Sequence, residues 1–262
     1  MKKKNNHFNI KASLRDSSPS ILTAIPVFNE YRHVNQIVSA VRQFTDDILV
    51  IDDGSTDGSQ IWINNCSFIK KVIHPANQGY GQSIIDAINY AKKNNFHWLI
   101  TIDCDHQHQP EYISRFYDEI KKDNCDIISG SRYLTSENKS PLAPPADRIK
   151  INKRITGLLN CWFNLNITDA FCGFKAYKVT SISNLHLTEK GYAMPLQLWI
   201  QAAAEKLKIT EIKVPLIYHD VERNFAGKLE DPAYRMNYYM QTIIHELFDY
   251  ENKNTSTIRN TL

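Results

Sequence analysis

Several features that would assign this chain of 262 residues to a familiar class are missing from its sequence. No segment approaches the roughly 18 consecutive apolar residues that a membrane-spanning helix requires. Residues 1–20 are basic and polar and lack the apolar core of a signal peptide. Internal repeats and low-complexity tracts are absent as well. The sequence therefore predicts a globular protein without a membrane span.

Cysteine is scarce, and its spacing suggests no pairing. The chain has five cysteines, an odd number, and no two of them form a C-x-x-C pair. A disulfide framework and a structural zinc site are therefore not expected. A reducing, cytoplasmic setting is the simplest interpretation.

Three common catalytic signatures are also absent. No segment matches the phosphate-binding loop G-x-x-x-x-G-K-[ST], and no G-x-S-x-G serine elbow occurs. Gly79-Tyr80-Gly81 begins a dinucleotide-binding fingerprint but lacks its third glycine, which argues against a nicotinamide enzyme. The net charge of +3 is compatible with anionic substrates and too small to indicate a nucleic acid partner.

Short apolar segments alternate with segments of helical periodicity along most of the chain. The apolar patterns predict strands at 21–25, 47–51, 71–74, 98–102, 126–129, 174–178 and 209–217. The helical patterns predict helices at 30–44 and 57–68, after 79, from 110, and at about 149–163, 194–207 and 233–249. Pro26 is expected to end the first strand, and 131–148 to form a loop. This alternation favours an α/β fold with a doubly wound, mostly parallel sheet.

The most informative segment follows the fourth predicted strand. Asp103, Asp105 and Gln107 alternate there, and an extended backbone would point all three side chains the same way. Two carboxylates and an amide oxygen suit Mg²⁺ or Mn²⁺, with phosphate oxygens completing the shell. His106 and His108 would then face away, in surface or supporting roles, because no third zinc ligand follows at a familiar spacing. The alternative is a turn in which an aspartate caps the next helix.

Other polar residues follow the first two predicted strands. Asp52 and Asp53 close the second strand before a glycine-bearing turn, where carboxylates can accept from a base or from ribose hydroxyls. Phe28 follows the first strand and could stack on a base, while Glu30 could accept from it. Ordinary helix capping around Asn29 is the competing interpretation.

Cations occur where a phosphate could be bound. Arg132 follows the fifth strand, where a guanidinium can fork onto phosphate or carboxylate. Arg223 and Lys228 flank a glycine-containing loop that could close over a pyrophosphate. The alternative for all three is an ordinary solvated charge or surface ion pair.

Taken together and in this order, the motifs resemble those of the family 2 glycosyltransferases, most closely the dolichyl-phosphate mannosyltransferase branch. The resemblance spans roughly residues 21–230 and rests on segments 26–30, 52–58, 77–79, 103–107, 130–133 and 173–177. It implies a GT-A fold and inverting transfer from a UDP- or GDP-sugar, in cell-envelope polysaccharide or glycolipid synthesis.

The resemblance also assigns roles to individual residues. The nucleotide-sugar site would comprise Pro26, Phe28, Glu30, Asp52, Asp53, Gly79 and Asp103. Asp105 and Gln107 would bind the metal, and the donor or acceptor phosphates would be held by Arg132, Arg223 and Lys228. The set of expected catalytic residues is Asp103, Asp105, Asp169 and Arg132.

Two departures from the family pattern concern the acceptor. Gln197 stands where the branch usually has an acidic residue, so Asp169 is the next candidate for a general base. The loop before Lys228 lacks the usual serine. The acceptor could be a polyprenyl phosphate or a hydroxyl. A module that binds a nucleotide sugar without turnover, and a metal-dependent nucleotidyltransferase, remain alternative functions.

The resemblance implies a single domain over residues 21–250. Its nucleotide-sugar half would span about 21–133 and its acceptor half about 149–250, with residues 1–20 and 251–262 as a flexible leader and tail. The segment 148–163 is basic and amphipathic and could touch the inner face of a membrane near a lipid phosphate. A helix packed on the sheet is the competing interpretation.

Overall fold

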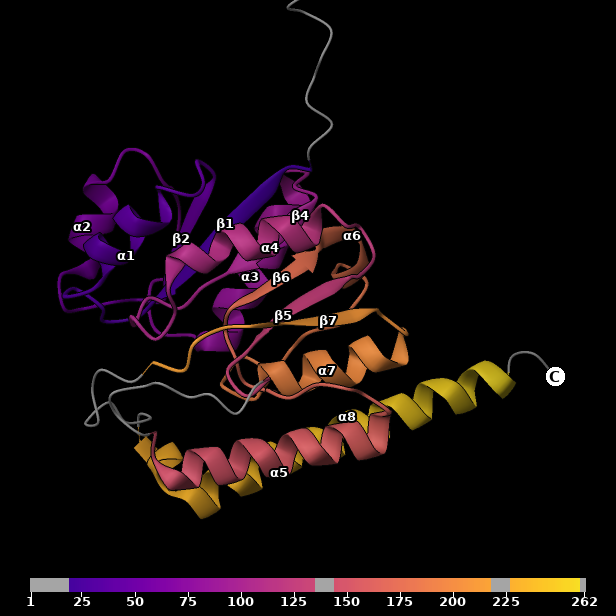
Figure 1. Cartoon of the computed structure of the whole chain (residues 1–262). Helices are drawn as coiled ribbons and strands as arrows, with labels where there is room; N and C mark the ends of the chain where they lie inside the picture. Colours follow the sequence, from indigo (N-terminus) through magenta and orange to yellow (C-terminus); the bar gives the residue numbers. More distant parts are fainter. Residues whose placement is uncertain (1–18, 135–143, 218–226, 260–262) are drawn as a thin grey trace, which may run out of the picture.

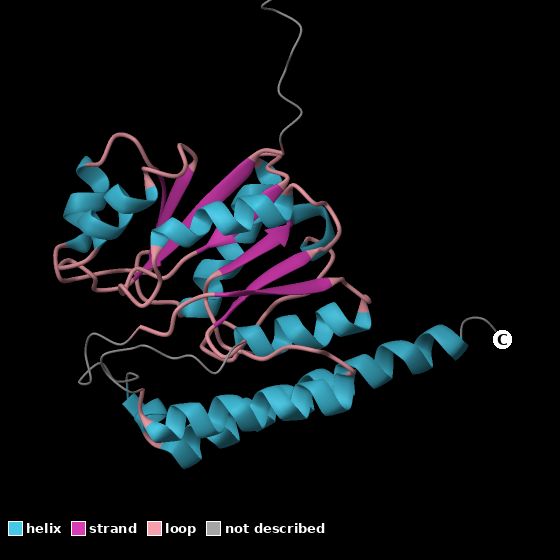
Figure 2. Ribbon diagram, in the orientation of Figure 1, coloured by secondary structure: helices cyan, strands magenta, loops and turns pink. Residues whose placement is uncertain are grey.

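A seven-stranded sheet with helices on both faces organises the part of the chain that the structure describes (Figures 1 and 2). The computed structural model describes residues 19–134, 144–217 and 227–259, with 250–259 described by their backbone alone. This architecture confirms the predicted α/β class.

The elements follow the predicted alternation. The strands are β1 (Ile21–Val27), β2 (Ile48–Asp52), β3 (Lys70–Ile73), β4 (Trp98–Thr101), β5 (Ile127–Ser131), β6 (Lys175–Lys178) and β7 (Ile209–Lys213). The α-helices are α1 (Val34–Val41), α2 (Ser59–Asn65), α3 (Tyr80–Lys93), α4 (Ile113–Ile120), α5 (Ala146–Phe163), α6 (Val179–Ile182), α7 (Met194–Ala204) and α8 (Pro232–Arg259). Two short 3-10 helices are η2 (Pro110–Tyr112) and η3 (Gly227–Glu230). Among the described helices, none is long and apolar enough to cross a bilayer.

The strand order is β3-β2-β1-β4-β6-β5-β7. β1 runs parallel to β2 and β4, and β5 runs parallel to β7, whereas β6 is antiparallel to both of its neighbours. The chain leaves β1 toward β2 and β3 and then returns to β4 on the other side of β1. Open α/β sheets bind their ligands at such a reversal, beyond the carboxyl ends of the strands.

Two apolar cores, one on each face, hold the sheet between helices. In β2, Ile48 and Val50 belong to the core under α1, α2 and α4, whereas Leu49 and Ile51 belong to the core under α3, α7 and α8. This alternation is the period of two that a strand buried on both faces requires. In Figure 1, α5 and α8 lie side by side beneath α7, as an outer layer on the second face.

Pro26 does not end the first strand, contrary to the prediction. β1 continues to Val27, and Pro26 is in register with Ile51 of β2. The Ala24 carbonyl accepts from the backbone N–H of Ile102, so the backbone polar groups of Ala24 face the chain that continues β4. Those of Pro26, two residues later, face the same side of β1, away from β2. Pairing with β4 has already ended at Ala24, and the missing N–H of Pro26 therefore costs no ladder bond.

Other element boundaries also differ from the prediction, and three of the differences bear on the cavity or the chain end. α5 begins at Ala146, directly after Pro145, which suits the start of a helix. β7 ends at Lys213, two residues before Pro215. α8 continues to Arg259, so most of the predicted flexible tail is helical; that segment contains no proline or glycine to stop it. The predicted leader falls almost entirely outside the described residues.

Candidate active site

A cavity of about 630 Å³ opens at the carboxyl ends of β1, β2 and β4. Its walls come from the strand ends, the start of α3 and the helices α5 and α8. We call the first part the donor wall, and it consists of Pro26, Val27, Phe28, Glu30, Asp53, Asn77, Gly79, Tyr80, Ser83, Asp103, Cys104, Asp105 and Gln107. The second part is the acceptor wall, formed by Arg132, Tyr133, Pro144, Arg148, Ile151, Asn152, Phe171, Gly191, Tyr192, Pro195, Arg235 and Tyr239.

The two adjacent aspartates after β2 have different positions. Asp53 lines the cavity, and its carboxylate accepts the backbone N–H groups of Gln78 (2.8 Å) and Gly79 (2.9 Å). His74 Nδ1 lies 2.7 Å from the same carboxylate. Asp53 thus fixes the loop of residues 77–79 at this end of the donor wall.

Asp52 faces away from the cavity, which corrects its predicted contact with the nucleotide. Its side chain is fully buried and accepts from the Ser55 N–H (3.2 Å) and the Gln60 amide (3.0 Å). Successive residues at a strand end point to opposite faces, so only one of the two aspartates can reach the ligand.

Gly79 holds a position that only glycine can take. Its φ is +104°, and a Cβ there would lie 2.4 Å from the carbonyl oxygen of Lys190. The close approach joins the start of α3 to the segment before α7, and so brings the donor and acceptor walls together.

The carboxylate loop after β4 does not have the extended geometry that the sequence suggested. His106 has a φ of +59°, and the Asp105 carboxylate accepts the backbone N–H of Gln107 (3.0 Å) in a tight turn. Asp103, Asp105 and Gln107 nevertheless all line the same cavity. The turn, rather than strand alternation, brings the three oxygen-bearing side chains together.

These residues fit a hard divalent cation. Two carboxylates and an amide oxygen share one wall of a cavity that also has room for phosphate oxygens. The Oδ1 atom of Asp103 is buried and has no hydrogen-bond partner among the described residues, so this carboxylate retains ligand capacity.

The Asp103 carboxylate is tightly packed against the backbone of Gly173. A Cβ on Gly173 would lie 2.2 Å from this carboxylate, so only glycine fits there. Burial alone would raise the pKa of Asp103, but the contact with His108 and the charges of Lys175 and Arg132 lower it below its ordinary value. The carboxylate is therefore held in its anionic form beside the cavity.

Asp169, the candidate base, is placed unsuitably for that role. It is fully buried and absent from the cavity lining; it accepts from Arg132 Nε (2.7 Å) and Nη2 (2.9 Å) and from the Asn152 amide (2.8 Å). Burial would raise its pKa, but the Arg132 charge and these hydrogen bonds hold it far below the usual carboxyl range. A carboxylate this acidic and this enclosed is a poor proton acceptor, and its evident effect is to orient Arg132.

Gln197 also lies away from the cavity. Its amide oxygen accepts the backbone N–H groups of Thr188 (2.7 Å) and Glu189 (2.8 Å), and its amide nitrogen donates to Glu246 (2.5 Å). The residue ties α7 to α8 and to the preceding segment, so it has a structural place in this chain.

The cations differ from the expected set. Arg132 lines the cavity, but Lys228 is exposed on η3, with its Nζ 5.9 Å from the Tyr234 ring, and does not line it. Arg223 lies outside the described residues. Arg148 and Arg235 line the acceptor wall, and sequence reasoning missed both. Arg148 opens the basic amphipathic segment that the sequence did reveal, whereas nothing in the sequence signalled Arg235.

A mostly parallel sheet with a carboxylate loop and a cavity beyond its switch point is the arrangement that a GT-A glycosyltransferase requires. The chain belongs to glycosyl transferase family 2, whose family model matches residues 23–185. The predicted class of enzyme, a nucleotide-sugar-dependent hexosyltransferase, is thereby confirmed.

Named relatives cover most of the chain. An undecaprenyl-phosphate mannosyltransferase from Micrococcus luteus is 23% identical over 223 residues, which is 81% of this chain and 90% of the relative. A polyprenol monophosphomannose synthase from Mycolicibacterium smegmatis is 25% identical over 203 residues, 74% of this chain and 76% of the relative. A UDP-N-acetylglucosamine–dolichyl-phosphate N-acetylglucosaminyltransferase from Methanococcus voltae is 26% identical over 219 residues, 76% and 86% of the two chains.

Solved structures support the fold. A glucosyl-3-phosphoglycerate synthase from Mycobacterium tuberculosis, in complex with Mn²⁺, UDP and its product, superposes with a TM-score of 0.62 at 15% identity. The match covers 88% of this chain and 80% of that one. At this identity the likeness establishes the GT-A fold alone.

Proposed function

We propose that this enzyme transfers a hexose from a nucleoside-diphosphate sugar to a polyprenyl phosphate, with inversion at the anomeric carbon. The observation that carries the proposal is the division of one cavity into two walls of different chemistry. The donor wall is rich in carboxylate and amide oxygens, and the acceptor wall combines arginines with aromatic and aliphatic side chains.

The donor wall suits a nucleoside diphosphate bound with a divalent cation. Phe28 offers an exposed ring at the nucleoside end, beside Glu30 and Asp53. Asp103, Asp105 and Gln107 would hold Mg²⁺ or Mn²⁺. When bound, the cation would neutralise charge that develops on the departing diphosphate.

The acceptor wall suits a phosphate joined to an apolar chain. Arg132 and Arg148 offer guanidinium groups, which bind phosphate through paired N–H donors. Ile151, Phe171 and Tyr239 supply apolar surface beside them, and the Phe171 and Tyr239 rings lie 4.8 Å apart. The three named relatives act on polyprenyl or dolichyl phosphates, which supports the same acceptor here.

A phosphate acceptor explains how the enzyme works without an evident base. A phosphate monoester loses its second proton with a pKa of about 6, so its oxygen is already a nucleophile at neutral pH. That oxygen forms the new bond to the anomeric carbon while the bond from this carbon to the donor diphosphate breaks and its electron pair leaves with the diphosphate. No proton has to be removed from this acceptor, so the reaction needs no general base. Asp169 and Gln197 can therefore be engaged inside the fold without loss of activity.

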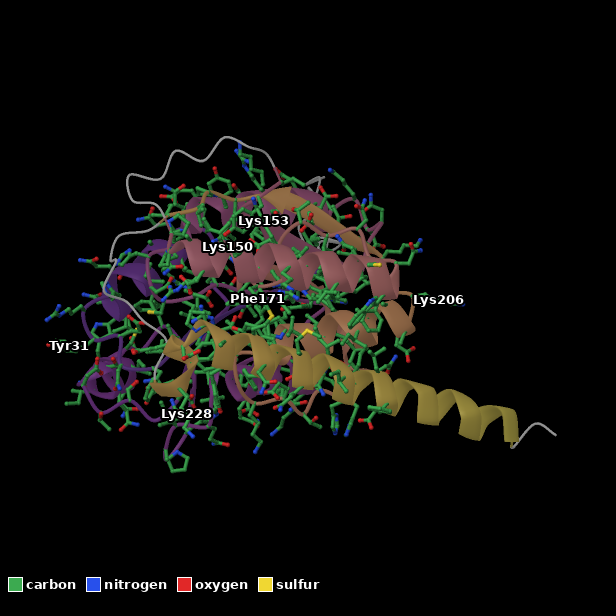
Figure 3. All side chains as sticks on the ribbon, turned by 90° about the horizontal axis from the view of Figure 1, so that it is seen from below. Tyr31, Lys150, Lys153, Phe171, Lys206 and Lys228 are labelled. Carbon is green, nitrogen blue, oxygen red and sulfur yellow. The ribbon has the colours of Figure 1, made fainter. Side chains whose placement is uncertain are left out.

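We further propose that the outer face of α5 contacts an anionic membrane surface. The exposed positions of this helix include Lys150, Lys153 and Arg154 and no acidic residue, and Trp162 is exposed near its end. Figure 3 shows Lys150 and Lys153 on the outward side of the layer that α5 forms with α8. Basic residues with a flanking tryptophan are typical of helices that lie at a membrane surface.

A donor and acceptor screen tests the proposal. UDP- and GDP-sugars with Mn²⁺ are first ranked by thermal shift, because a ligand that binds only the folded state raises its apparent stability. The best donors are then incubated with a polyprenyl phosphate, and sugar transfer to the lipid is the expected result. Donor binding without transfer to any lipid phosphate would favour a binding module, and pyrophosphate release from a nucleoside triphosphate would favour a nucleotidyltransferase.

A further inference from the structure

His108 is a buried histidine whose ring has one polar contact. It is 3% exposed, its Nε2 lies 3.3 Å from Asp103 Oδ2, and its ring packs against Phe174 with centroids 5.4 Å apart. Its Nδ1 is buried and meets no hydrogen-bond partner among the described residues. A ring that donates from Nε2 to the carboxylate accounts for this arrangement.

The contact closes the carboxylate loop at its base. Asp103 and His108 stand at the two ends of the tight turn that contains Asp105 and Gln107. Four residues separate them in the sequence, and the left-handed conformation of His106 turns the chain back between them. Holding the ends together limits the positions that Asp105 and Gln107 can take.

We propose that His108 is a positioning residue for the donor site: its Nε2–H holds Asp103 Oδ2 and fixes the loop that presents the metal-binding oxygens. This inference rests on the proposed function, since it concerns the cation and diphosphate of the donor. His108 itself is absent from the cavity lining, so its effect on the donor would pass through Asp103. Outer partners of this kind orient the groups that bind a metal.

The buried Nδ1 of His108, which has no partner among the described residues, argues against a purely structural role for this side chain. A buried acceptor without a partner destabilises a fold, and an apolar side chain of similar size avoids that cost. The ring of His108 otherwise packs against Phe174, which is apolar. Folding alone therefore does not require histidine at this position.

His74 provides the matched contrast. It is also buried, at 5% exposure, but its Nδ1 lies 2.7 Å from Asp53 and its Nε2 2.9 Å from Asp86. Both of its nitrogens have partners, so removal of this ring breaks two contacts to carboxylates. The pair therefore compares a buried histidine with two polar contacts to one with a single contact, and the difference in stability between their leucine variants is the quantity of interest.

The experiment compares His108→Leu, His108→Gln and His74→Leu with the wild-type enzyme. Melting temperatures are measured without ligand. The affinity for Mn²⁺ is measured by calorimetry in the presence of UDP or GDP, whichever gives the wild-type enzyme the larger thermal shift. We expect His108→Leu to lower the melting temperature by less than His74→Leu does, because Asp103 lines the cavity and can be hydrated there, and to bind Mn²⁺ with the chosen nucleotide about 10- to 100-fold more weakly. His108→Gln, whose amide can donate to Asp103, should recover part of that affinity. His74→Leu should lower the melting temperature by about 5 °C or more.

Two results would overturn the inference. One is a folded His108→Leu that binds Mn²⁺ and the chosen nucleotide as tightly as the wild type, and the other is a His108→Leu that loses as much stability as His74→Leu does. The binding measurement uses no acceptor, so failure of the wild type to glycosylate a polyprenyl phosphate would overturn the acceptor assignment alone. A wild-type enzyme that binds no Mn²⁺ with either UDP or GDP would overturn both.

Discussion

The donor and acceptor walls of the cavity are built in different ways. Short loops at strand ends form most of the donor wall, and backbone N–H groups bonded to buried carboxylates hold it, as Asp53 holds Gln78 and Gly79. The acceptor wall comes largely from helices far apart in the chain, and pairs of opposite charge join them. Asp147 of α5 pairs with Arg235 of α8, and Arg132 pairs with Asp169. Donor binding thus depends on loop geometry, and acceptor binding on the placement of arginines.

The largest effect is expected in the donor wall, from Asp105→Ala. The variant loses a carboxylate that would hold the cation, and stabilisation of a departing diphosphate is worth several kcal/mol, so kcat should fall by about 1,000-fold or more. EDTA should have a similar effect on the wild type. Asp118→Ala, on the exposed side of α4, is the matched control and should keep full activity. Normal turnover by Asp105→Ala would contradict the proposal that a cation held by this carboxylate is needed for transfer.

The next effect concerns the ion pair beneath the acceptor wall. Asp169→Asn leaves the Arg132 charge buried without its partner, which should cost about 3–5 kcal/mol of unfolding free energy. The pKa of Asp169 is depressed in the fold, so its contribution is complete above the unfolded value of about 3.9 and fades as the pH falls further. Urea unfolding from pH 7 to pH 3 should therefore show a shallower acid decline for the variant. Asp123→Asn, which removes an exposed partner of Lys178, should reproduce the wild-type curve.

A smaller effect should separate the two walls directly. Arg148→Ala should raise the KM for the polyprenyl phosphate by roughly 10- to 100-fold, because a hydrogen bond between charged groups is worth about 1.5–3 kcal/mol. The KM for the nucleotide sugar should stay constant. Lys228→Ala is the matched control, since this side chain does not line the cavity. If Lys228→Ala raised the KM for the polyprenyl phosphate and Arg148→Ala did not, the assignment of the acceptor site to the acceptor wall would be wrong.

The smallest effect is expected outside the cavity, on α5. The double variant Lys150→Glu with Lys153→Glu should bind vesicles containing phosphatidylglycerol on the order of tenfold more weakly, because each basic residue near an anionic surface contributes about 1 kcal/mol. Co-sedimentation at low and moderate salt measures the change. Lys92→Glu with Lys93→Glu, at the exposed end of α3, alters the net charge equally and should bind like the wild type. Equal losses in both pairs would mean that net charge, and not this helix face, governs binding.

The donor wall could be predicted from the sequence to a large extent. Strand ends place their polar residues at one edge of a parallel sheet, so motifs that follow strands converge without any knowledge of distant packing. The exceptions within this wall are local. Asp52 and Asp53 are adjacent in sequence but face opposite ways, and the turn at Asp105 depends on a left-handed His106, which sequence patterns rarely reveal.

The acceptor wall could not be predicted in the same way. Arg235 reaches the cavity because α8 packs beside α5, and it lies 88 positions after its partner Asp147 in the sequence. The pairing of Arg132 with Asp169 arises because the chain after α5 returns to the sheet as the antiparallel strand β6, between β4 and β5. Helical periodicity predicts that α5 and α8 exist but not which of their residues meet, so Asp169 looked like a free carboxylate.

The most direct test of the central claim, that one cavity brings a donor diphosphate to a phosphate acceptor, uses two lipids of the same chain length. A polyprenyl phosphate and the corresponding polyprenol are incubated with the enzyme, Mn²⁺ and the preferred nucleotide sugar, and the anomeric configuration of any product is determined by NMR. We expect sugar to be transferred to the phosphate alone and with inversion. Equal transfer to the alcohol, or a product that retains the donor configuration, would contradict the account.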